Sequence, residues 1–542
     1  MDTVPTLATP AGGATRHPTI FEPATLILLT VLCIVGAVIG MQLLVTLGVT
    51  PNTSIIGALV AMGLARVRLP AFARFRSIHV QNLAQSAISA ATFGAGNSLL
   101  LPIGIPFLLD RSDLVLPLLG GVALAMLVDA TMLYRLFGSR AFPAEGAWPP
   151  GIAAAEAILA GDQGGRRMAL LGAGVAAGVA GTGFFGIPMS AFGVAFIGNI
   201  WALAMFGVGL LLRGYSPQLF SGLLPGGDIG RALIPHGIMI GAGLVALAQV
   251  GLVMAARQEA GAGAARGAGR ALGAGAVAYV AVAALIAAGG GLFSELSVPM
   301  LVAFVLYAAF AALVHELIVG LAAMHSGWFP AFAVALITLI VGMLAGFPAV
   351  PLALLVGFAA ATGPAFADMG YDLKAGHMLR GQGADPAFEA DGRFQQYLAA
   401  MFAFAVAAVV VTISYKGYFA AGLVAPVAKV YVATIKAGAT PGAAWQLLAW
   451  AVPGAVLQLL GGPRRQMGVL FATGMLIVFP AAGWAVLAGV ALRLLYARLR
   501  GAPAQTGPDA ERQSGMEVFA GGVIAGDALT GFATGIIANL RR

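Results

Sequence analysis

The sequence predicts an all-α, polytopic integral membrane protein with about 16 transmembrane helices, some of them broken or re-entrant. Of its 542 residues, 60% are hydrophobic and 9% are charged, whereas an ordinary soluble domain has roughly 25% charged residues. The mean hydropathy is +0.94. This composition excludes a soluble enzyme, a nucleic-acid binder and a disordered chain. It disfavours a membrane β-barrel, whose strands would alternate apolar and polar residues.

The apolar segments follow one another with short connections, so no globular domain is inserted between them. Those that can cross a membrane lie near residues 24–47, 52–67, 80–109, 114–134, 168–190, 192–212, 233–256, 271–291, 297–322, 328–346, 350–367, 397–413, 443–460, 467–496 and 516–538. The segment 467–496 contains Pro480 and is long enough for two short crossings. We expect a single transmembrane domain over 24–538, with an N-terminal tail at 1–23 and a C-terminal tail at 539–542.

The basic residues predict the orientation of the chain. Arginines cluster in the loop after the second apolar segment, at Arg66, Arg68, Arg74 and Arg76. Cytoplasmic loops carry such an excess of Lys and Arg, so we expect a cytoplasmic N-terminus in a cell inner (plasma) membrane. The formal net charge of +8 then reflects topology and not nucleic-acid binding.

Two features leave the topology open. Arg213 and Arg231 precede, and Arg257 and Arg270 follow, what looks like a single crossing. Either a crossing is hidden near 214–232, or one segment enters and leaves on the same face. Polar residues otherwise concentrate in three stretches, where we expect surface helices or re-entrant segments: 135–167, 369–396 and 498–515.

Glycine is unusually frequent, at 76 of 542 residues. Pairs with four-residue spacing occur inside apolar segments at Gly36 and Gly40, Gly174 and Gly178, Gly522 and Gly526, and Gly531 and Gly535. Small residues at this spacing let membrane helices approach closely, so we expect tight packing at most of them. A minority would mark hinges or unwound backbone in a transport path.

The first polar segment lies in the third apolar stretch. Gln81 and Gln85 share one helix face, Asn82 lies between them, and Asn97 follows a Gly-Ala-Gly sequence. Amide side chains are costly in lipid, so this face either lines a path for substrate or hydrogen bonds to neighbouring helices. We expect the helix to break within Gly94–Pro102.

The second polar segment is W-P-P-G-I-A-A-A-E. Its substrate-path candidates are Trp148, Pro149, Gly151 and Glu156. Tandem prolines cannot lie in mid-helix, so the segment predicts a kinked helix start with backbone N–H groups suited to an anion. The alternative is a capped interfacial helix whose Trp148 anchors at the lipid headgroups.

The third polar segment is D-M-G-Y-D-L-K-A-G-H-M-L-R. Asp368 and Asp372 are four residues apart and predict a shared helix face. Lys374 and Arg380 lie close enough in sequence to hold Asp372 ionised in a structural pair. Asp372 and Lys374 are further candidates for the substrate path.

Metal or enzyme chemistry is not supported by these residues. Asp368 with Asp372, or His315 with Glu316, are the only sets that suggest a membrane enzyme acting on a lipid-linked substrate. No second acidic motif accompanies the aspartates, and the position three after Glu316 is Val319, where a zinc-protease signature has histidine. Catalysis needs a dense cluster of acids, bases or ligands, so we expect no cofactor and no metal site.

Ionisable residues inside apolar segments are the candidates for proton coupling. Asp527 ranks first, since no basic residue follows it before Arg541. Glu517 and Asp129 come next. Asp129 has Arg135 within two helical turns as a possible structural partner.

At these segments the chain resembles the oligopeptide transporter (OPT) superfamily, which includes the yellow-stripe-like metal-chelate carriers. Trp148–Ile158 resembles the family signature F-P-S-G-T-A-T-A-E, and Asn82–Ala90 is similar to its N-x-x-Q-x-x-A-S block. Asp372–Gly376, with Gln395-Gln396 opening the next crossing, resembles its D-L-K-T-G block. Ala520–Leu529 resembles its last helix. The blocks follow the family's order.

The resemblance implies a secondary transporter that imports its substrate with protons by alternating access. The expected partners are a lipid bilayer, protons, and small oligopeptides or amino-acid-derived solutes; the alternative is a siderophore- or nicotianamine-like metal chelate. Gln395 and Gln396 join the substrate-path candidates on this basis. The chain departs from the signature at Trp148, Pro150, Ile152 and Ala154, where the family has phenylalanine, serine and two threonines. A channel is disfavoured because no filter segment is evident.

Overall fold

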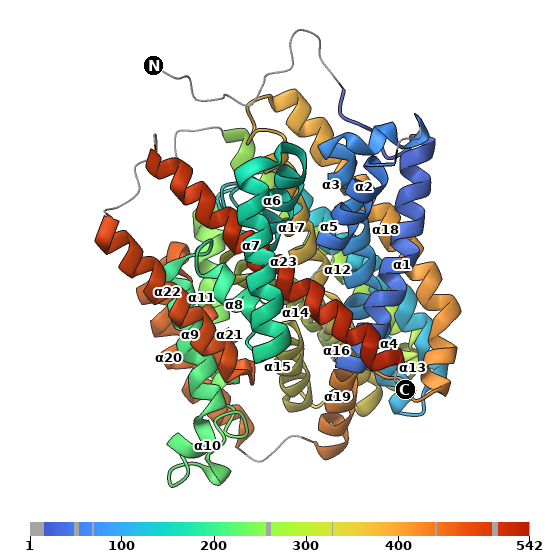
Figure 1. Cartoon of the computed structure of the whole chain (residues 1–542). Helices are drawn as coiled ribbons and strands as arrows, with labels where there is room; N and C mark the ends of the chain where they lie inside the picture. Colours follow the sequence, from blue (N-terminus) through green and yellow to red (C-terminus); the bar gives the residue numbers. More distant parts are fainter. Residues whose placement is uncertain are drawn as a thin grey trace.

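The computed structural model describes residues 16–47, 54–67, 70–255, 262–327, 329–438, 442–500 and 508–540. These residues form a bundle of helices with no strand among them (Figure 1). The helices are α1 (Pro23–Leu47), α2 (Ser54–Ala65), α3 (Ile78–Phe93), α4 (Leu101–Leu108), α5 (Val115–Leu136), α6 (Pro149–Gln163), α7 (Gly165–Phe185), α8 (Met189–Val194), α9 (Ile200–Gly214), α10 (Ser216–Leu219), α11 (Ile234–Ala255), α12 (Ala262–Gly289), α13 (Leu292–Glu295), α14 (Val298–Ser326), α15 (Ala331–Leu344), α16 (Ala349–Ala361), α17 (Pro364–Leu379), α18 (Pro386–Ala420), α19 (Pro426–Ala437), α20 (Ala443–Arg465), α21 (Met467–Leu476), α22 (Pro480–Arg500) and α23 (Pro508–Leu540).

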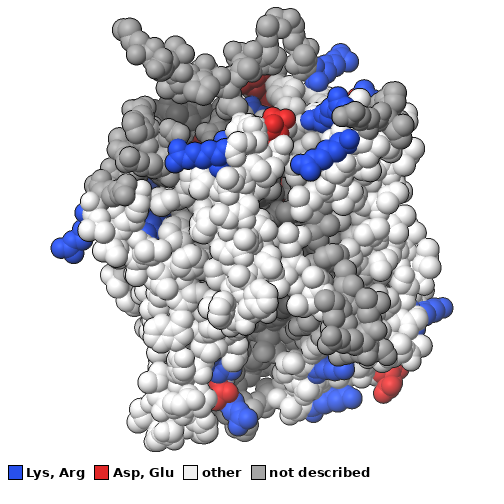
Figure 2. Space-filling view, viewed as in Figure 1, with Lys and Arg blue, Asp and Glu red and all other residues white. Residues whose placement is uncertain are grey.

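The bundle is built to lie in lipid. Ten helices in the described part of the chain are long and apolar enough to span a membrane, which confirms the predicted all-α polytopic fold. Large apolar side chains such as Ile27 and Leu306 point outward. Figure 2 shows Lys and Arg gathered toward the two ends of the viewed face, with an almost uncharged middle. The predicted count of about 16 crossings stays a prediction.

Some of the helix boundaries predicted from the sequence agree with the structure, and others do not. The segment 467–496 divides at Pro480 into α21 and α22, as predicted. Residues 214–232 contain only α10 and turns, so the crossing hidden there in one interpretation is absent. The predicted tail 1–23 lies largely, and the tail 539–542 partly, outside the described residues.

The prediction of a break within Gly94–Pro102 is wrong. The backbone stays helical from α3 into α4 and widens into a π-helix over Gly94–Leu100. The whole segment Ile78–Leu108 is buried inside the bundle. A π-helical turn changes which side chains face a neighbouring helix without exposing backbone groups, so the polarity of Asn97 is accommodated without interrupting the chain.

The prediction that residues 369–396 lie at a surface or in a re-entrant loop is wrong for residues 369–380, whereas most of residues 381–391 are exposed or partly exposed. Helix α17 is buried from Pro364 to His377 and packs against α3, α5, α6, α14 and α18. Its polar residues enter the interior because polar groups of α3 and α18 meet them there. The sequence pattern of one helix could not reveal that compensation.

Most predicted glycine pairs are helix crossings. A Cβ at Gly174 or Gly178 of α7 would collide with the backbone of α23, and a Cβ at Gly522 or Gly526 of α23 would collide with the backbone of α7. Figure 1 shows α23 running across α7. Gly36 and Gly40 meet the backbone of α3 in the same way, whereas Gly531 faces open space. The tight-packing interpretation is therefore confirmed for three of the four pairs.

We expect Gly174→Ala to destabilise the folded protein by about 1–3 kcal/mol, because the added methyl group forces two helix backbones apart. Gly172→Ala is the matched control, since that position on the same helix has open space around it. The control substitution should leave stability unchanged or raise it by up to about 1 kcal/mol through helix propensity. Thermal unfolding in detergent measures both, and equal stabilities for the two variants would contradict the crossing.

Candidate functional site

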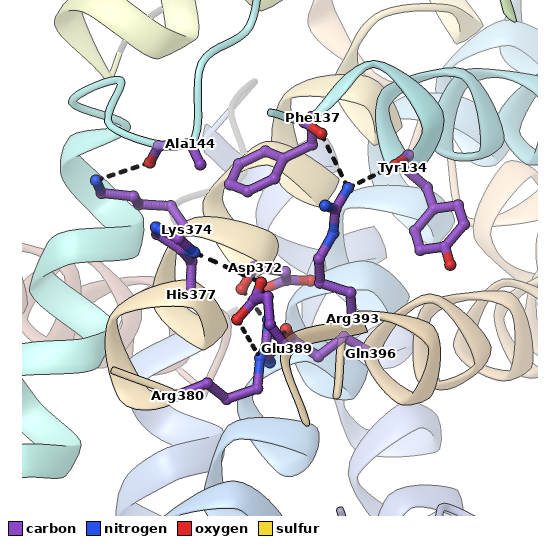
Figure 3. A network of polar contacts seen from close by, with 10 residues as sticks. All are labelled: Tyr134, Phe137, Ala144, Asp372, Lys374, His377, Arg380, Glu389, Arg393 and Gln396. Carbon is purple, nitrogen blue, oxygen red and sulfur yellow. Dashed lines mark hydrogen bonds and ion pairs between the residues drawn. The ribbon is translucent and has the colours of Figure 1, made fainter. Parts of the chain in front are cut away.

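The most polar part of the interior lies where α3, α17 and α18 meet. We call it the polar core; its members are buried, and several are drawn in Figure 3. They are Gln81, Asn82, Gln85, Ser86, Ser89, Asp368, Asp372, Lys374, Arg380, Glu389 and Gln396. The structure therefore brings Gln85, a substrate-path candidate predicted on α3, together with Asp372 and Gln396 of the candidates predicted at 372–396.

Gln396 is the central connection of the polar core. Its Nε2 donates to the carbonyl oxygen of Asp372 at 2.7 Å and to Ser86 Oγ at 3.1 Å. Its Oε1 accepts from Arg380 Nη1 at 2.7 Å. One amide thus joins α3, α17 and α18. Its neighbour Gln395 instead accepts from the backbone N–H of Ile20 at 3.1 Å, away from the polar core.

The basic residues of α17 do not pair with Asp372, contrary to the sequence prediction. Arg380 binds Glu389 of α18 through Nε at 2.8 Å and Nη2 at 3.1 Å (Figure 3). Lys374 Nζ donates to the carbonyl oxygen of Ala144 at 3.0 Å. Lys374, two residues from Asp372, lies on another face of the helix, whereas Arg380 lies about two turns away, just beyond the end of α17, which explains the difference.

The two aspartates of α17 share the face that meets α3, as predicted. Ser89 Oγ donates to Asp368 at 2.5 Å. Asp372 lies beside Gln85 and Ser86, whose polar groups interact with its carboxylate without full hydrogen-bond geometry, and no Lys or Arg pairs with it among the described residues. A buried ionised carboxylate without a partner is costly. The site is therefore suited to a proton or a cationic group.

Trp148 is part of the core and not an anchor at the headgroups. It is fully buried, and its ring packs edge-on against Tyr371 with 5.9 Å between centroids. Its carbonyl accepts the N–H of Gly151 at 2.8 Å. Because Pro149 and Pro150 have no N–H, the first turn of α6 offers no unpaired backbone donor, and the anion site expected there is absent.

The rest of α6 makes structural contacts. A Cβ at Gly151 would collide with the carbonyl oxygen of Tyr371, so this glycine marks a close crossing of α6 and α17. Glu156 is 3% exposed and pairs with Arg167 at 2.6 Å. That ion pair accounts for the charge of Glu156 outside the polar core.

The first predicted coupling residue, Asp527, also has partners. Thr182 Oγ1 donates to one carboxylate oxygen at 2.5 Å, and the backbone N–H of Ser190 donates to the other at 2.9 Å. Asp527 therefore connects α23 to the C-terminal part of α7 and the first turn of α8. Glu517, on the same helix, lies within electrostatic range of Glu156 and Lys374.

A second buried acidic group was not predicted as a unit. Asp129 of α5, Tyr279 of α12 and Glu316 of α14 are fully buried, and the Tyr279 hydroxyl contacts both carboxyl groups. The backbone N–H of Gly363 donates to Asp129 at 2.6 Å. The expected pairing of Asp129 with Arg135 is wrong. Asp129, Tyr279 and Glu316 lie in three different apolar segments. The sequence could therefore indicate the two carboxyl groups only as separate ionisable residues and could not show that they meet.

The comparisons with known proteins concern the second half of the chain. A family model described as OPT oligopeptide transporter protein matches residues 272–538. The matched part includes α17, α18 and α23, and thus the acidic side of the polar core and the predicted coupling residues of α23. No curated protein matches the sequence.

We expect Gln396→Ala to destabilise the protein by about 1–3 kcal/mol, because three hydrogen-bonding groups, on α3, on α17 and at the end of α17, lose a buried partner. Gln395→Ala is the matched control and should cost roughly 0.5–1.5 kcal/mol, since it removes one partly exposed hydrogen bond. Thermal unfolding of both variants in the same detergent measures the difference. A larger loss in the control would show that Gln396 is not the central connection.

Proposed function

We propose that this chain, which belongs to the oligopeptide transporter family, is a proton-coupled secondary active transporter. It imports small oligopeptides or amino-acid-derived solutes across a cell inner (plasma) membrane by alternating access. Its N-terminus lies in the cytoplasm, as the Arg-rich loop after α2 suggests. Transport needs polar groups inside the bundle, and the polar core is the place where α3, α17 and α18 supply them.

The observation that carries this proposal is the buried carboxylate of Asp372, which has no cationic partner among the described residues. A small peptide offers an ammonium group, amide N–H groups and a carboxylate. Asp372 can receive the ammonium, and Gln85 next to it can bond to the amide groups. Lys374 is 8% exposed, and its one hydrogen bond among the described residues goes to the carbonyl of Ala144, so it retains donors for a carboxylate.

A proteoliposome assay tests the substrate class. The purified chain is reconstituted and offered labelled tripeptides, or iron or nickel chelates of nicotianamine type, with and without an inward proton gradient. We expect tripeptide uptake that increases with the gradient. Uptake of chelates alone would favour the metal-chelate branch of the superfamily, and uptake of neither probe class would contradict the proposal.

Asp372→Asn should abolish tripeptide uptake while preserving folded yield, because it removes the buried negative charge and keeps the shape of the side chain. Asp391→Asn is the control: near the start of α18, Asp391 accepts from the backbone N–H of His17 and, among the described residues, makes no other hydrogen bond. Initial uptake rates and size-exclusion profiles measure both. Normal uptake by Asp372→Asn would remove Asp372 from the binding site.

Coupling requires a carboxyl group that gains and loses a proton during the cycle. The candidates predicted from sequence are Asp527, Glu517 and Asp129. Of these we favour Asp129, because Asp527 is held by Thr182 and Ser190 at a helix junction. Asp129 lies instead against another buried carboxyl group.

A further inference from the structure

Two carboxyl groups and one phenol form a compact unit in the interior, which we call the carboxyl cluster. It consists of Asp129, Tyr279 and Glu316, with the Gly363 N–H as its backbone donor. These residues come from α5, α12, α14 and the junction between α16 and α17. The Tyr279 ring also packs edge-on against Phe358 of α16, with 6.0 Å between centroids. The cluster therefore joins α5, α12 and α14 to the junction between α16 and α17.

The hydrogen bonds of the carboxyl cluster require a bound proton. The Tyr279 hydroxyl has one hydrogen and contacts both Asp129 and Glu316. It can donate to one carboxylate only, so the other carboxyl group must donate to the phenol oxygen and must itself be protonated. Asp129 already accepts from the Gly363 N–H at 2.6 Å, which favours its ionised form. The extra proton is therefore assigned to Glu316.

No basic side chain neutralises the cluster. In the part of the chain that the structure describes, no Lys or Arg pairs with Asp129 or Glu316. His315 of α14 turns its Nδ1 to the carbonyl oxygen of Ala359. Asp368 of α17 faces Ser89.

The remaining titratable neighbours face away from the cluster. Tyr397 of α18 bonds to Thr131, which lies two residues after Asp129 on α5 and therefore on the opposite side of that helix. Arg135 of the same helix is exposed. If both carboxyl groups of the cluster were ionised, the two negative charges would repel each other with no positive charge nearby. This repulsion is strongly unfavourable in the buried interior.

The cluster is attached to a glycine junction of the backbone. Helix α16 ends at Ala361 and α17 begins at Pro364, with Gly363 between them at φ +95°. This left-handed conformation is accessible to glycine and costly for other residues. Beyond the junction, α17 carries Asp368, Asp372 and Lys374 of the polar core.

We propose that the carboxyl cluster is the proton-binding site of the transport cycle and that its proton controls the position of α17 through the Gly363 amide. The inference rests on the proposed function. With the proton bound, Glu316 donates to Tyr279, Tyr279 donates to Asp129, and Asp129 holds the junction. When the proton leaves Glu316 for water, two carboxylates compete for one phenol hydrogen. Their repulsion releases Asp129 from Gly363, and α17 shifts with its part of the polar core.

Infrared difference spectroscopy of the purified full-length protein in lipid tests the proton directly, without substrate. We expect wild-type protein at neutral pH to show a protonated carboxyl C=O band that Glu316→Gln removes. Asp527→Asn is the control and should remove no such band. If Glu316→Gln retains every protonated-carboxyl band of the wild type, the proton is not on the cluster and the proposal is overturned.

Transport of labelled trialanine in proteoliposomes tests the coupling. Glu316→Gln and Asp129→Asn should lose accumulation driven by a proton gradient while keeping exchange of internal for external trialanine, because exchange needs no net proton movement. Asp527→Asn should keep both. Normal accumulation by Glu316→Gln, or loss of coupling in Asp527→Asn alone, overturns the assignment.

Two further results separate the possible failures. If wild-type vesicles do not respond to the gradient, the proposed function fails, and the infrared band alone then decides whether the cluster holds a proton. If Glu316→Gln and Asp129→Asn do not fold, Tyr279→Phe replaces them, since it keeps both carboxyl groups. We expect that variant to shift the protonated-carboxyl band because the phenol bond is lost, and an unshifted band overturns the proposal.

Discussion

The structure depends on one constraint: a polar group inside a lipid-embedded bundle must find its partner within the protein. The Arg380–Glu389 ion pair and the amide of Gln396 show how α17 satisfies it, since each connects that helix to a neighbour. The same constraint explains the π-helical segment Gly94–Leu100, which adjusts the facing of side chains without opening a backbone hydrogen-bond ladder. Buried polar side chains in this interior therefore pair with polar groups on neighbouring helices, and no single helix could satisfy its own polar residues.

The sequence was informative where one segment determines its own structure. The length of the apolar runs predicts the membrane fold, Pro480 predicts the division between α21 and α22, and the four-residue glycine spacing predicts close crossings. Asp368 and Asp372 share a face because helical periodicity alone places them there. Part of the candidate site was predicted as well, because polar residues that the sequence singled out on α3, α17 and α18 lie together in the structure.

The sequence failed where the partner lies on another helix. Arg135 is near Asp129 in sequence, but Tyr279 and Gly363 are near it in space. Lys374 and Arg380 are likewise neighbours of Asp372 only along the chain. The division between α16 and α17 was also missed, because Thr362-Gly363-Pro364 sits inside a continuous apolar run and its break depends on contacts with α5 and α14.

The crossing of α7 and α23 has a mechanical consequence. Gly174, Gly178, Gly522 and Gly526 bring two backbones together with no side chain between them, so neither helix can slide or roll without a steric clash. The two helices form a rigid pair, and Asp527 attaches α8 to this pair through a hydrogen bond from the backbone N–H of Ser190. A conformational cycle in this molecule must therefore move other helices relative to α7 and α23, which keep their positions relative to each other.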